Sequence, residues 1–155
     1  MAVTAVIKSE RTGPLQTRIC VIDGQGGGIG ANVIKRLKEE YAETIEVLAL
    51  GTNAIATSQM MKARANRGAT GENAIVRTVY QADLIIGPIA VTWANAMMGE
   101  VTPAMAAAVT SCPAPKILLP LFQEGVAMVG LAGDPLPHLV EEIVTKILKE
   151  YIRNV

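Results

Sequence analysis

Five glycines fall within seven residues in the stretch DGQGGGIG, residues 23–30. An apolar run, RICVI at 18–22, precedes them, and an amphipathic helical pattern follows from residue 29. The N-terminus of a helix offers unpaired N–H groups and a partial positive charge, which together bind phosphate, and glycines let the ligand approach the backbone. The spacing therefore predicts a phosphate-binding turn made of Gly24, Gln25, Gly26, Gly27, Gly28, Ile29 and Gly30.

Two glycine spacings in this turn match cofactor fingerprints. The set Gly26-x-Gly28-x-x-Ala31 fits the looser dinucleotide fingerprint. In the other spacing, Gly24-x-x-x-Gly28-x-Gly30, the surrounding VIDGQGGGIGANVIKRLKEE resembles the cofactor loop of short-chain dehydrogenases. That resemblance implies NAD(P), or another phosphate-bearing nucleotide, as the cofactor. A tight turn that serves only helix–strand packing stays open as the alternative.

The rest of the chain lacks the catalytic part of that enzyme family. Asp23 stands where the family has a threonine-like residue, and it could bind a metal or accept hydrogen bonds from loop amides, the second being favoured. The family's Tyr-x-x-x-Lys pair is absent, since Tyr41, Tyr80 and Tyr151 are each followed four residues later by an apolar residue. No Gly-Lys-Ser/Thr follows the glycines either. The chain is therefore not a working short-chain dehydrogenase.

The second strand is expected to end at GTN, residues 51–53. A dinucleotide-binding domain usually carries a carboxylate here for the adenosine ribose. This chain instead has Thr52 and Asn53, which could accept a ribose 2′-phosphate or bond a hydroxyl, although no arginine stands beside them. NAD is therefore not specified, and NADP is only mildly favoured. Either residue could equally serve as the N-cap of the next helix.

Further candidates surround the same predicted crevice. The third strand ends at Gly87, Pro88 and Ile89, where bare backbone could pass a ribose or a ring. Glu72 and Glu100 are, with Asp23, the acidic candidates for proton transfer, although a solvated loop carboxylate or a capping carboxylate is the favoured role for Glu72 and Glu100. Two cysteines and one histidine give neither a disulfide framework nor a zinc pattern. No metal site is expected.

The elements that would position these residues alternate along the chain. Buried apolar runs predict strands at 18–22, 45–50, 83–91, 116–121 and 126–131. The connection between the last two strands is short enough for an antiparallel hairpin. Helical periodicity predicts helices from residue 29, over 54–68, over 74–82 (where a strand is also possible), over 103–111 and over 134–152. Residues 68–73 read as a glycine-broken loop, and Thr102 with Pro103 as a helix start.

This alternation is typical of an α/β fold. We expect a single three-layer Rossmann-like domain over residues 18–155, with residues 1–17 as an N-terminal tail or arm. The expected sheet is mainly parallel and five-stranded, in the order 2-1-3-4-5. Ligands in such sheets bind at the carboxyl ends of the strands, where the strand order reverses.

Over residues 18–153 the chain resembles a small bacterial family of Rossmann-like proteins, a domain of unknown function. The segments that carry the resemblance are VIDGQGGGIG, GTNAIAT, GATGEN, DLIIGPI and GEVTPAMA. The resemblance implies the Rossmann-like fold and implies that these segments form one site. It implies no particular reaction.

Composition narrows the partners. The 155 residues carry no net charge and include only five aromatic side chains, so nucleic-acid binding is disfavoured. No apolar stretch is long enough for a membrane span, no signal-peptide layout is present, and a cytoplasmic location is expected. Small-residue segments such as WANAMM and PAMAAAV favour a homo-oligomer, although they could also pack inside one subunit.

Three functions remain after this reading. The first is a nucleotide- or dinucleotide-binding protein without full catalytic machinery, acting as a sensor or as a subunit of a complex. The second is a small NAD(P)-dependent reductase or transferase that uses Asp23, Glu72 or Glu100 for acid–base work. The third is a structural assembly protein with no ligand, in which the glycines serve packing alone.

Overall fold

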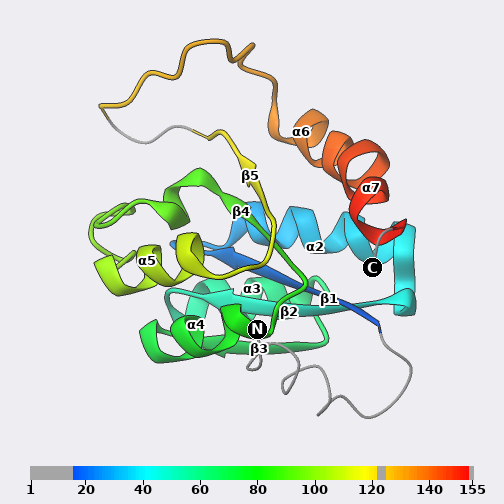
Figure 1. Ribbon diagram of the computed structural model, residues 1–155, viewed down its shortest axis with the longest axis horizontal. Coiled ribbons are helices and arrows are strands. Elements are labelled where there is room, and N and C mark those ends of the chain that lie inside the picture. The colour runs from blue at the N-terminus through cyan, green and yellow to red at the C-terminus, as the bar shows by residue number, and fades with distance from the viewer. Residues whose placement is uncertain (1–15, 122–124, 154–155) are drawn as a thin grey trace.

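The computed structural model describes residues 16–121 and 125–153. Its centre is one sheet of five parallel strands in the order β3-β2-β1-β4-β5 (Figure 1). The strands are β1 (Thr17–Asp23), β2 (Ile45–Gly51), β3 (Arg67–Thr70), β4 (Leu84–Pro88) and β5 (Lys116–Leu119). Because β1 lies between β2 and β4, the strand order reverses beside β1, and a ligand crevice is expected at its carboxyl end.

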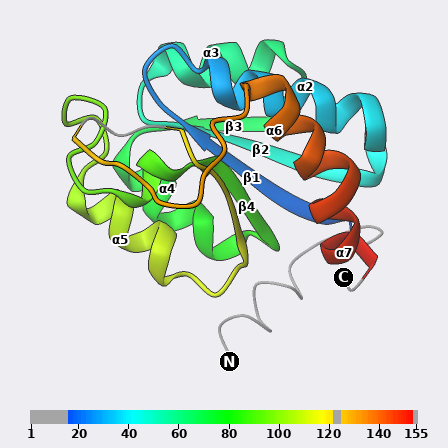
Figure 2. The ribbon, with the colours of Figure 1, turned by 90° about the horizontal axis from the view of Figure 1, so that it is seen from above.

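Helices cover both faces of the sheet and make three layers (Figure 2). One face carries α2 (Gly28–Tyr41), α3 (Ala54–Lys62) and the C-terminal helix, which runs as α6 (Leu136–Glu142), the π-helical turn η4 (Ile143–Ile147) and α7 (Leu148–Arg153). The other face carries α4 (Glu72–Thr78) and α5 (Pro103–Ser111). Short 3₁₀ turns lie at η1 (Ala42–Thr44), η2 (Val79–Gln81) and η3 (Ile89–Thr92).

The central strand is buried on both faces. Along β1, Ile19 and Val21 pack into the cluster under α2 and α3, while Cys20 and Ile22 pack into the cluster under α4 and α5. Side chains of a strand alternate between the two faces, so a strand covered on both sides has to be continuously apolar. This is why RICVI could be identified as a strand from the sequence.

The fold class expected from the sequence is confirmed, but one strand was missed. Residues 54–68 were expected to form a single helix, yet α3 ends at Lys62, and Arg67–Thr70 pairs with β2 as the edge strand β3. The helix ends where Arg64 adopts a left-handed backbone, with φ of 79°. Glycine or asparagine usually takes this conformation, so an arginine gives no stop signal. The strand itself is short, contains Gly68 and is largely exposed, and therefore carries no apolar pattern.

The predicted strand at 126–131 and its antiparallel hairpin are wrong. Within the described part of this segment the backbone is irregular, and Met128, Val129 and Leu131 are exposed. In Figure 1 the segment from 125 to 135 runs outside the body of the domain before α6 begins. An apolar run predicts a strand only when the sheet can bury it, and β5 instead pairs in parallel with β4 and with no other described strand.

The other predicted elements are present, with shorter bounds in places. The strand expected at 83–91 ends its pairing at Pro88, and residues 89–92 form η3. The segment expected as a helix at 74–82 is α4 followed by η2, and Thr102 caps α5 by accepting a hydrogen bond from the Met105 amide at 3.2 Å. The expected N-terminal arm, residues 1–17, lies outside the described residues apart from Gln16 and Thr17, and Thr17 begins β1.

No helix within residues 16–121 and 125–153 is long and apolar enough to cross a membrane.

Candidate functional site

The glycine turn, residues 24–30, follows β1 directly. The side chain of Asp23, the last residue of β1, folds back into this turn. Its carboxylate accepts hydrogen bonds from the amides of Gly24, at 2.8 Å, and Gly30, at 2.7 Å, and the residue is only 2% exposed. Burial raises the pKa of Asp23, and the amide hydrogen bonds oppose that shift. Of the two roles considered from the sequence, the contacts match hydrogen bonding to loop amides. The carboxylate braces the turn and is buried within it.

Three glycines of the turn are closely packed against neighbouring residues. A Cβ on Gly24 would lie 2.5 Å from the Met97 sulfur, and one on Gly30 would lie 2.5 Å from the Met60 sulfur. Gly27 is the N-cap of α2, with φ of 73°, and its Cβ would lie 2.8 Å from the backbone of Ala56. These three positions admit no larger residue without movement, whether or not a ligand binds.

Gly26 and Gly28 have no such reason to be glycine. A Cβ built on either one meets no atom within 4 Å, and neither has a φ in the left-handed region. Both residues are exposed, and neither amide meets an acceptor among the described residues. The fold therefore tolerates a side chain at both positions, and the two N–H groups, at the start of α2 and just before it, have no hydrogen-bond acceptor within the described part of the chain.

The two residues of the predicted turn that are not glycine, Gln25 and Ile29, contact other parts of the chain. Ile29 is half-buried and packs against the core under α2. The Gln25 backbone is instead used for contacts with the rest of the site: its amide donates to the Glu100 carboxylate at 2.9 Å, and its carbonyl accepts from the Asn53 amide group at 3.0 Å.

Glu100 connects the glycine turn with the end of β2. Its Oε1 accepts hydrogen bonds from the Gln25 amide at 2.9 Å, from the Thr52 hydroxyl at 2.8 Å and from the Asn53 side-chain amide at 2.6 Å. Burial disfavours the charged form of Glu100, but these three hydrogen bonds outweigh it and lower the pKa. The carboxylate is therefore an anion at neutral pH.

Thr52 and Asn53 have structural contacts of their own. The Asn53 side chain accepts from the Ala56 amide at 2.9 Å and so caps α3, as one reading of the sequence expected. The Thr52 amide donates to the carbonyl of Asp23 at 3.0 Å, which ties the end of β2 to the end of β1. Both residues are partly exposed, so capping leaves room for contact with a ligand.

The loop that contains Glu100 has an unusual backbone conformation. Between η3 and α5, the residues Asn95, Met97, Met98 and Gly99 all have positive φ values. The loop lays Met97 against Gly24 and leaves Trp93, at 39%, and Met98, at 98%, exposed. Positive φ is unfavourable for residues with a side chain, so the contacts of Glu100 and Met97 help to hold this conformation.

Gly87, Pro88 and Ile89 lie at the end of β4, as expected, and Gly87 has a packing role. A Cβ on Gly87 would lie 2.6 Å from the carbonyl oxygen of Ile22 on β1, so glycine is needed for strand packing. Gly87 and Pro88 are buried, and Ile89 is half-buried. Glu72, at the first position of α4, accepts a hydrogen bond from the Thr102 hydroxyl at 2.6 Å and, in the described part of the chain, forms no hydrogen bond or ion pair with the glycine turn.

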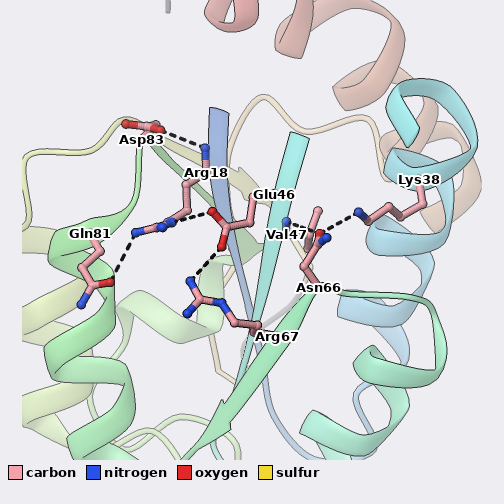
Figure 3. A network of polar contacts seen from close by, with 8 residues as sticks. All are labelled: Arg18, Lys38, Glu46, Val47, Asn66, Arg67, Gln81 and Asp83. Atoms are coloured by element: carbon pink, nitrogen blue, oxygen red, sulfur yellow. Dashed lines mark hydrogen bonds and ion pairs between the residues drawn. The ribbon is translucent and has the colours of Figure 1, made fainter. Parts of the chain in front are cut away.

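A second polar cluster, which sequence reasoning missed, lies near the amino ends of the strands, away from the glycine turn (Figure 3). Glu46 on β2 bonds Arg18 on β1 at 3.0 Å and Arg67 on β3 at 2.8 Å. Beside it, Asn66 accepts from the Lys38 ammonium at 2.6 Å and from the Val47 amide at 2.8 Å. These contacts tie three neighbouring strands and α2 together.

Two hollows in the surface lie elsewhere. One of about 400 Å³ lies between β5, residues 130–134 and the C-terminal helix, and another of about 270 Å³ lies beside β3, lined in part by Arg67 and Gln81. Neither includes a residue of the glycine turn. No group of three or more metal-ligating side chains occurs within the described ranges. The candidate site is therefore an open polar surface at the ends of β1 and β2.

Comparison with known proteins places the chain in a family. The family model described as Domain of unknown function (DUF3842) matches residues 18–152. No curated protein matches the sequence. Among solved structures, the chain is similar to a dodecameric FMN-dependent Ubix-like decarboxylase from Escherichia coli O157:H7, with 12% identity and a TM-score of 0.40, over 86% of this chain and 92% of that one. So loose a similarity says nothing about the chemistry of this chain.

Proposed function

The chain belongs to the DUF3842 family, a domain of unknown function, and we propose that it binds a phosphate-bearing nucleotide at the turn between β1 and α2. The observation that carries the proposal is that Gly26 and Gly28 face open space, where a Cβ would meet no neighbouring atom. Their bare backbone is required neither by packing nor by φ, and their amides have no acceptor among the described residues. A ligand that needs close approach to the backbone explains both glycines.

Phosphate is the group that suits these amides. They lie at the N-terminus of α2, a helix of 14 residues, where the helix dipole adds partial positive charge. The one carboxylate inside the turn, that of Asp23, already accepts hydrogen bonds from two other amides and is buried. The opening at Gly26 and Gly28 is therefore free to take phosphate oxygens.

The site favours binding over acid–base catalysis. Glu100 has a lowered pKa and is a poor proton donor at neutral pH, and Asp23 is enclosed within the turn. Glu72 is bonded to Thr102 on another loop. We therefore prefer a sensor or a subunit of a complex over a small NAD(P)-dependent reductase or transferase. Turnover that is lost in Glu100→Gln or Glu72→Gln would reverse that preference.

Binding is tested by calorimetric titration with NADH, NADPH, ATP, GTP, FAD and coenzyme A. Trp93 gives a second signal, because it lies on the loop that brings Glu100 to the glycine turn and is 39% exposed. We expect saturable binding of at least one nucleotide together with a change in Trp93 fluorescence.

The decisive variants are Gly26→Ala and Gly28→Ala. Each adds one methyl group in space that is empty in the protein, so we expect unchanged folding and a loss of affinity of about tenfold or more, since a loss of 1.4 kcal/mol is a factor of ten. Ser58→Ala on the exposed surface of α3 is the control and should bind as the parent does. Failure of every nucleotide to bind, or full affinity in both glycine variants, would contradict the proposal and favour the purely structural reading.

We also propose that the chain forms a homo-oligomer. The segment PAMAAAV does not supply the contact surface through its buried residues, since Met105, Ala106, Ala108 and Val109 of α5 pack against the sheet of their own chain. Exposed apolar side chains occur instead on residues 125–135, here called the outer segment, at Met128, Val129 and Leu131. Burial of these side chains in a contact between copies would remove them from water.

A further inference from the structure

The last strand of the sheet, β5, has a free edge. It pairs with β4 and with no other strand in the described part of the chain. The carbonyl of Pro115 accepts a hydrogen bond from an amide of β4 at 2.9 Å. Backbone groups of successive residues in a strand point to opposite sides, so those of Lys116 and Leu118 point away from β4. This edge can therefore take one more strand.

An apolar hollow of about 400 Å³ opens beside the same edge. Its walls are β5, residues 130–134 and the C-terminal helix. Its apolar lining includes Ile117, Leu119, Leu131, Leu139, Ile143 and Ile147. Apolar side chains are stabilised by removal from water, yet Leu131 is 42% exposed. A segment that pairs with β5 and carries apolar side chains on one face would fill this hollow.

The N-terminal segment of the chain has a sequence suited to both features. Residues 1–15 lie outside the described part of the chain. Within them, residues 2–7 read AVTAVI, and four of these six residues are β-branched. β-branched residues favour strands. Residues 2–7 are therefore the piece of this chain that we match to the free edge.

Charge favours the same match. Two carboxylates, Asp134 and Glu142, border the hollow, and neither forms an ion pair in the described part of the chain. The run at residues 2–7 is followed by two basic residues, Lys8 and Arg11, and one acidic residue, Glu10. Opposite signs attract, and the attraction is modest because Asp134 and Glu142 are exposed.

The segment is also long enough to reach β5. Cys20 on β1, Ile85 on β4 and Lys116 on β5 form one row across the sheet. Neighbouring strands are about 4.8 Å apart, so β5 lies roughly 10 Å from β1, and Thr17 lies about 10 Å back along β1 from that row. When extended, residues 8–16 can span about 30 Å, which exceeds this path.

We propose that residues 2–7 add to the free edge of β5 of their own chain as a sixth strand and place Val3, Ala5 and Ile7 in the apolar hollow. The strand is antiparallel to β5, because the segment joins β1 at its amino end and extends from there toward the carboxyl end of β5. Alternation along the strand puts Thr4 on the opposite face, so that no polar side chain enters the hollow. The glycine turn takes no part, so the inference does not rest on nucleotide binding.

Hydrogen exchange followed by NMR on the full-length protein tests this pairing. We expect alternate amides within residues 2–7, and the amide of Leu118, to exchange at least about tenfold more slowly than in an unfolded peptide. The protection should stay the same on tenfold dilution of the protein, because the segment and the edge belong to one chain.

Ile7→Asp and Val3→Asp are the decisive variants, because each places a charge in the apolar hollow. We expect either one to speed exchange at residues 2–7 and at Leu118 by about tenfold or more. Thr4→Asp, on the opposite face, is the control and should keep the protection. Slow exchange in β1 and β4 checks that every variant still folds, which we expect because the substitutions lie outside the five described strands.

Each remaining outcome overturns the proposal. Exchange of residues 2–7 in the parent at the rate of an unfolded peptide would show that they do not pair with β5. Protection that survives both Ile7→Asp and Val3→Asp would place the run elsewhere. Protection that falls on dilution would assign the strand on β5 to a second copy of the chain rather than to the same one.

Discussion

At the scale of single residues, the glycines of the turn divide into two groups with different physical roles. Gly24, Gly27 and Gly30 lie where a Cβ would collide with a neighbour, whereas Gly26 and Gly28 face open space. A glycine-rich string therefore mixes positions where packing restricts a side chain with positions where it does not. The sequence shows the string but does not show which glycine belongs to which group, because the colliding atoms come from α3 and the loop after β4.

This division predicts opposite effects on stability. Gly27→Ala places a side chain at φ of 73° and against the Ala56 backbone, and we expect a loss in the free energy of unfolding of about 2 kcal/mol or more. Gly28→Ala has no collision and reduces the freedom of the unfolded chain, so we expect no loss and a gain of up to about 1 kcal/mol. Urea denaturation measures both. Equal destabilisation by the two substitutions would show that Gly28 also serves packing.

At the scale of elements, the edge strand β3 is held to the sheet largely by polar contacts. Three of its four residues are exposed, and Arg67 bonds Glu46 on β2, which also bonds Arg18 on β1 (Figure 3). Burial of Glu46 disfavours its charge, but hydrogen bonds from Arg18 and Arg67 and their positive charges outweigh this and lower the pKa of Glu46. The ion pairs stabilise the fold only while Glu46 is ionised.

We therefore expect an acid-sensitive contribution from Glu46. A group whose pKa is lowered on folding contributes stability above its unfolded value, here 4.5, and loses it as the pH falls through the folded pKa, which lies below 4.5. Glu46→Gln should reduce the free energy of unfolding by about 1 kcal/mol at pH 7, a modest figure because Arg67 is largely exposed. Urea denaturation across pH checks this. A loss that stays constant down to pH 3, or an equal loss in Glu39→Gln on the exposed face of α2, would contradict the assignment.

At the scale of the whole molecule, the outer segment before α6 stands out. Residues 125–135 run outside the domain body in Figure 1, and Val129 within them is fully exposed. A hollow of about 400 Å³ lies between residues 130–134, β5 and the C-terminal helix. The exposed apolar side chains of this segment, Met128, Val129 and Leu131, are the surface that the proposed homo-oligomer would use.

Light scattering tests this at micromolar concentration. We expect a mass that is a multiple of the 155-residue chain, and we expect Val129→Asp to shift it toward one chain, because a charge in an apolar contact loses its hydration. Asp134→Asn, on the same segment but changing a side chain that is already polar, is the control. A parent protein of single-chain mass would contradict the proposal.

The sequence by itself determined the α/β class, the central strands and the place of the glycine turn. Strands buried on both faces, such as β1 and β2, are largely apolar along their length, and α2 has one apolar and one charged face. The local sequence pattern is therefore enough to identify these elements. The same local reading failed at β3 and at residues 126–131. At an edge or outside the body, partner strands rather than side-chain pattern decide whether a segment is a strand.

Only the tertiary structure decided how the site residues combine. Glu100 lies 75 residues from Gln25 and 47 from Asn53 along the chain, and no spacing rule relates them. They meet because parallel strands bring their carboxyl ends to one edge of the sheet, and because the wound loop after β4 turns back onto that edge. The sequence supplied a bare turn suited to phosphate, and the folded chain placed a carboxylate beside it. Hydrogen bonds between distant loops fix that arrangement, and their partners are chosen by topology.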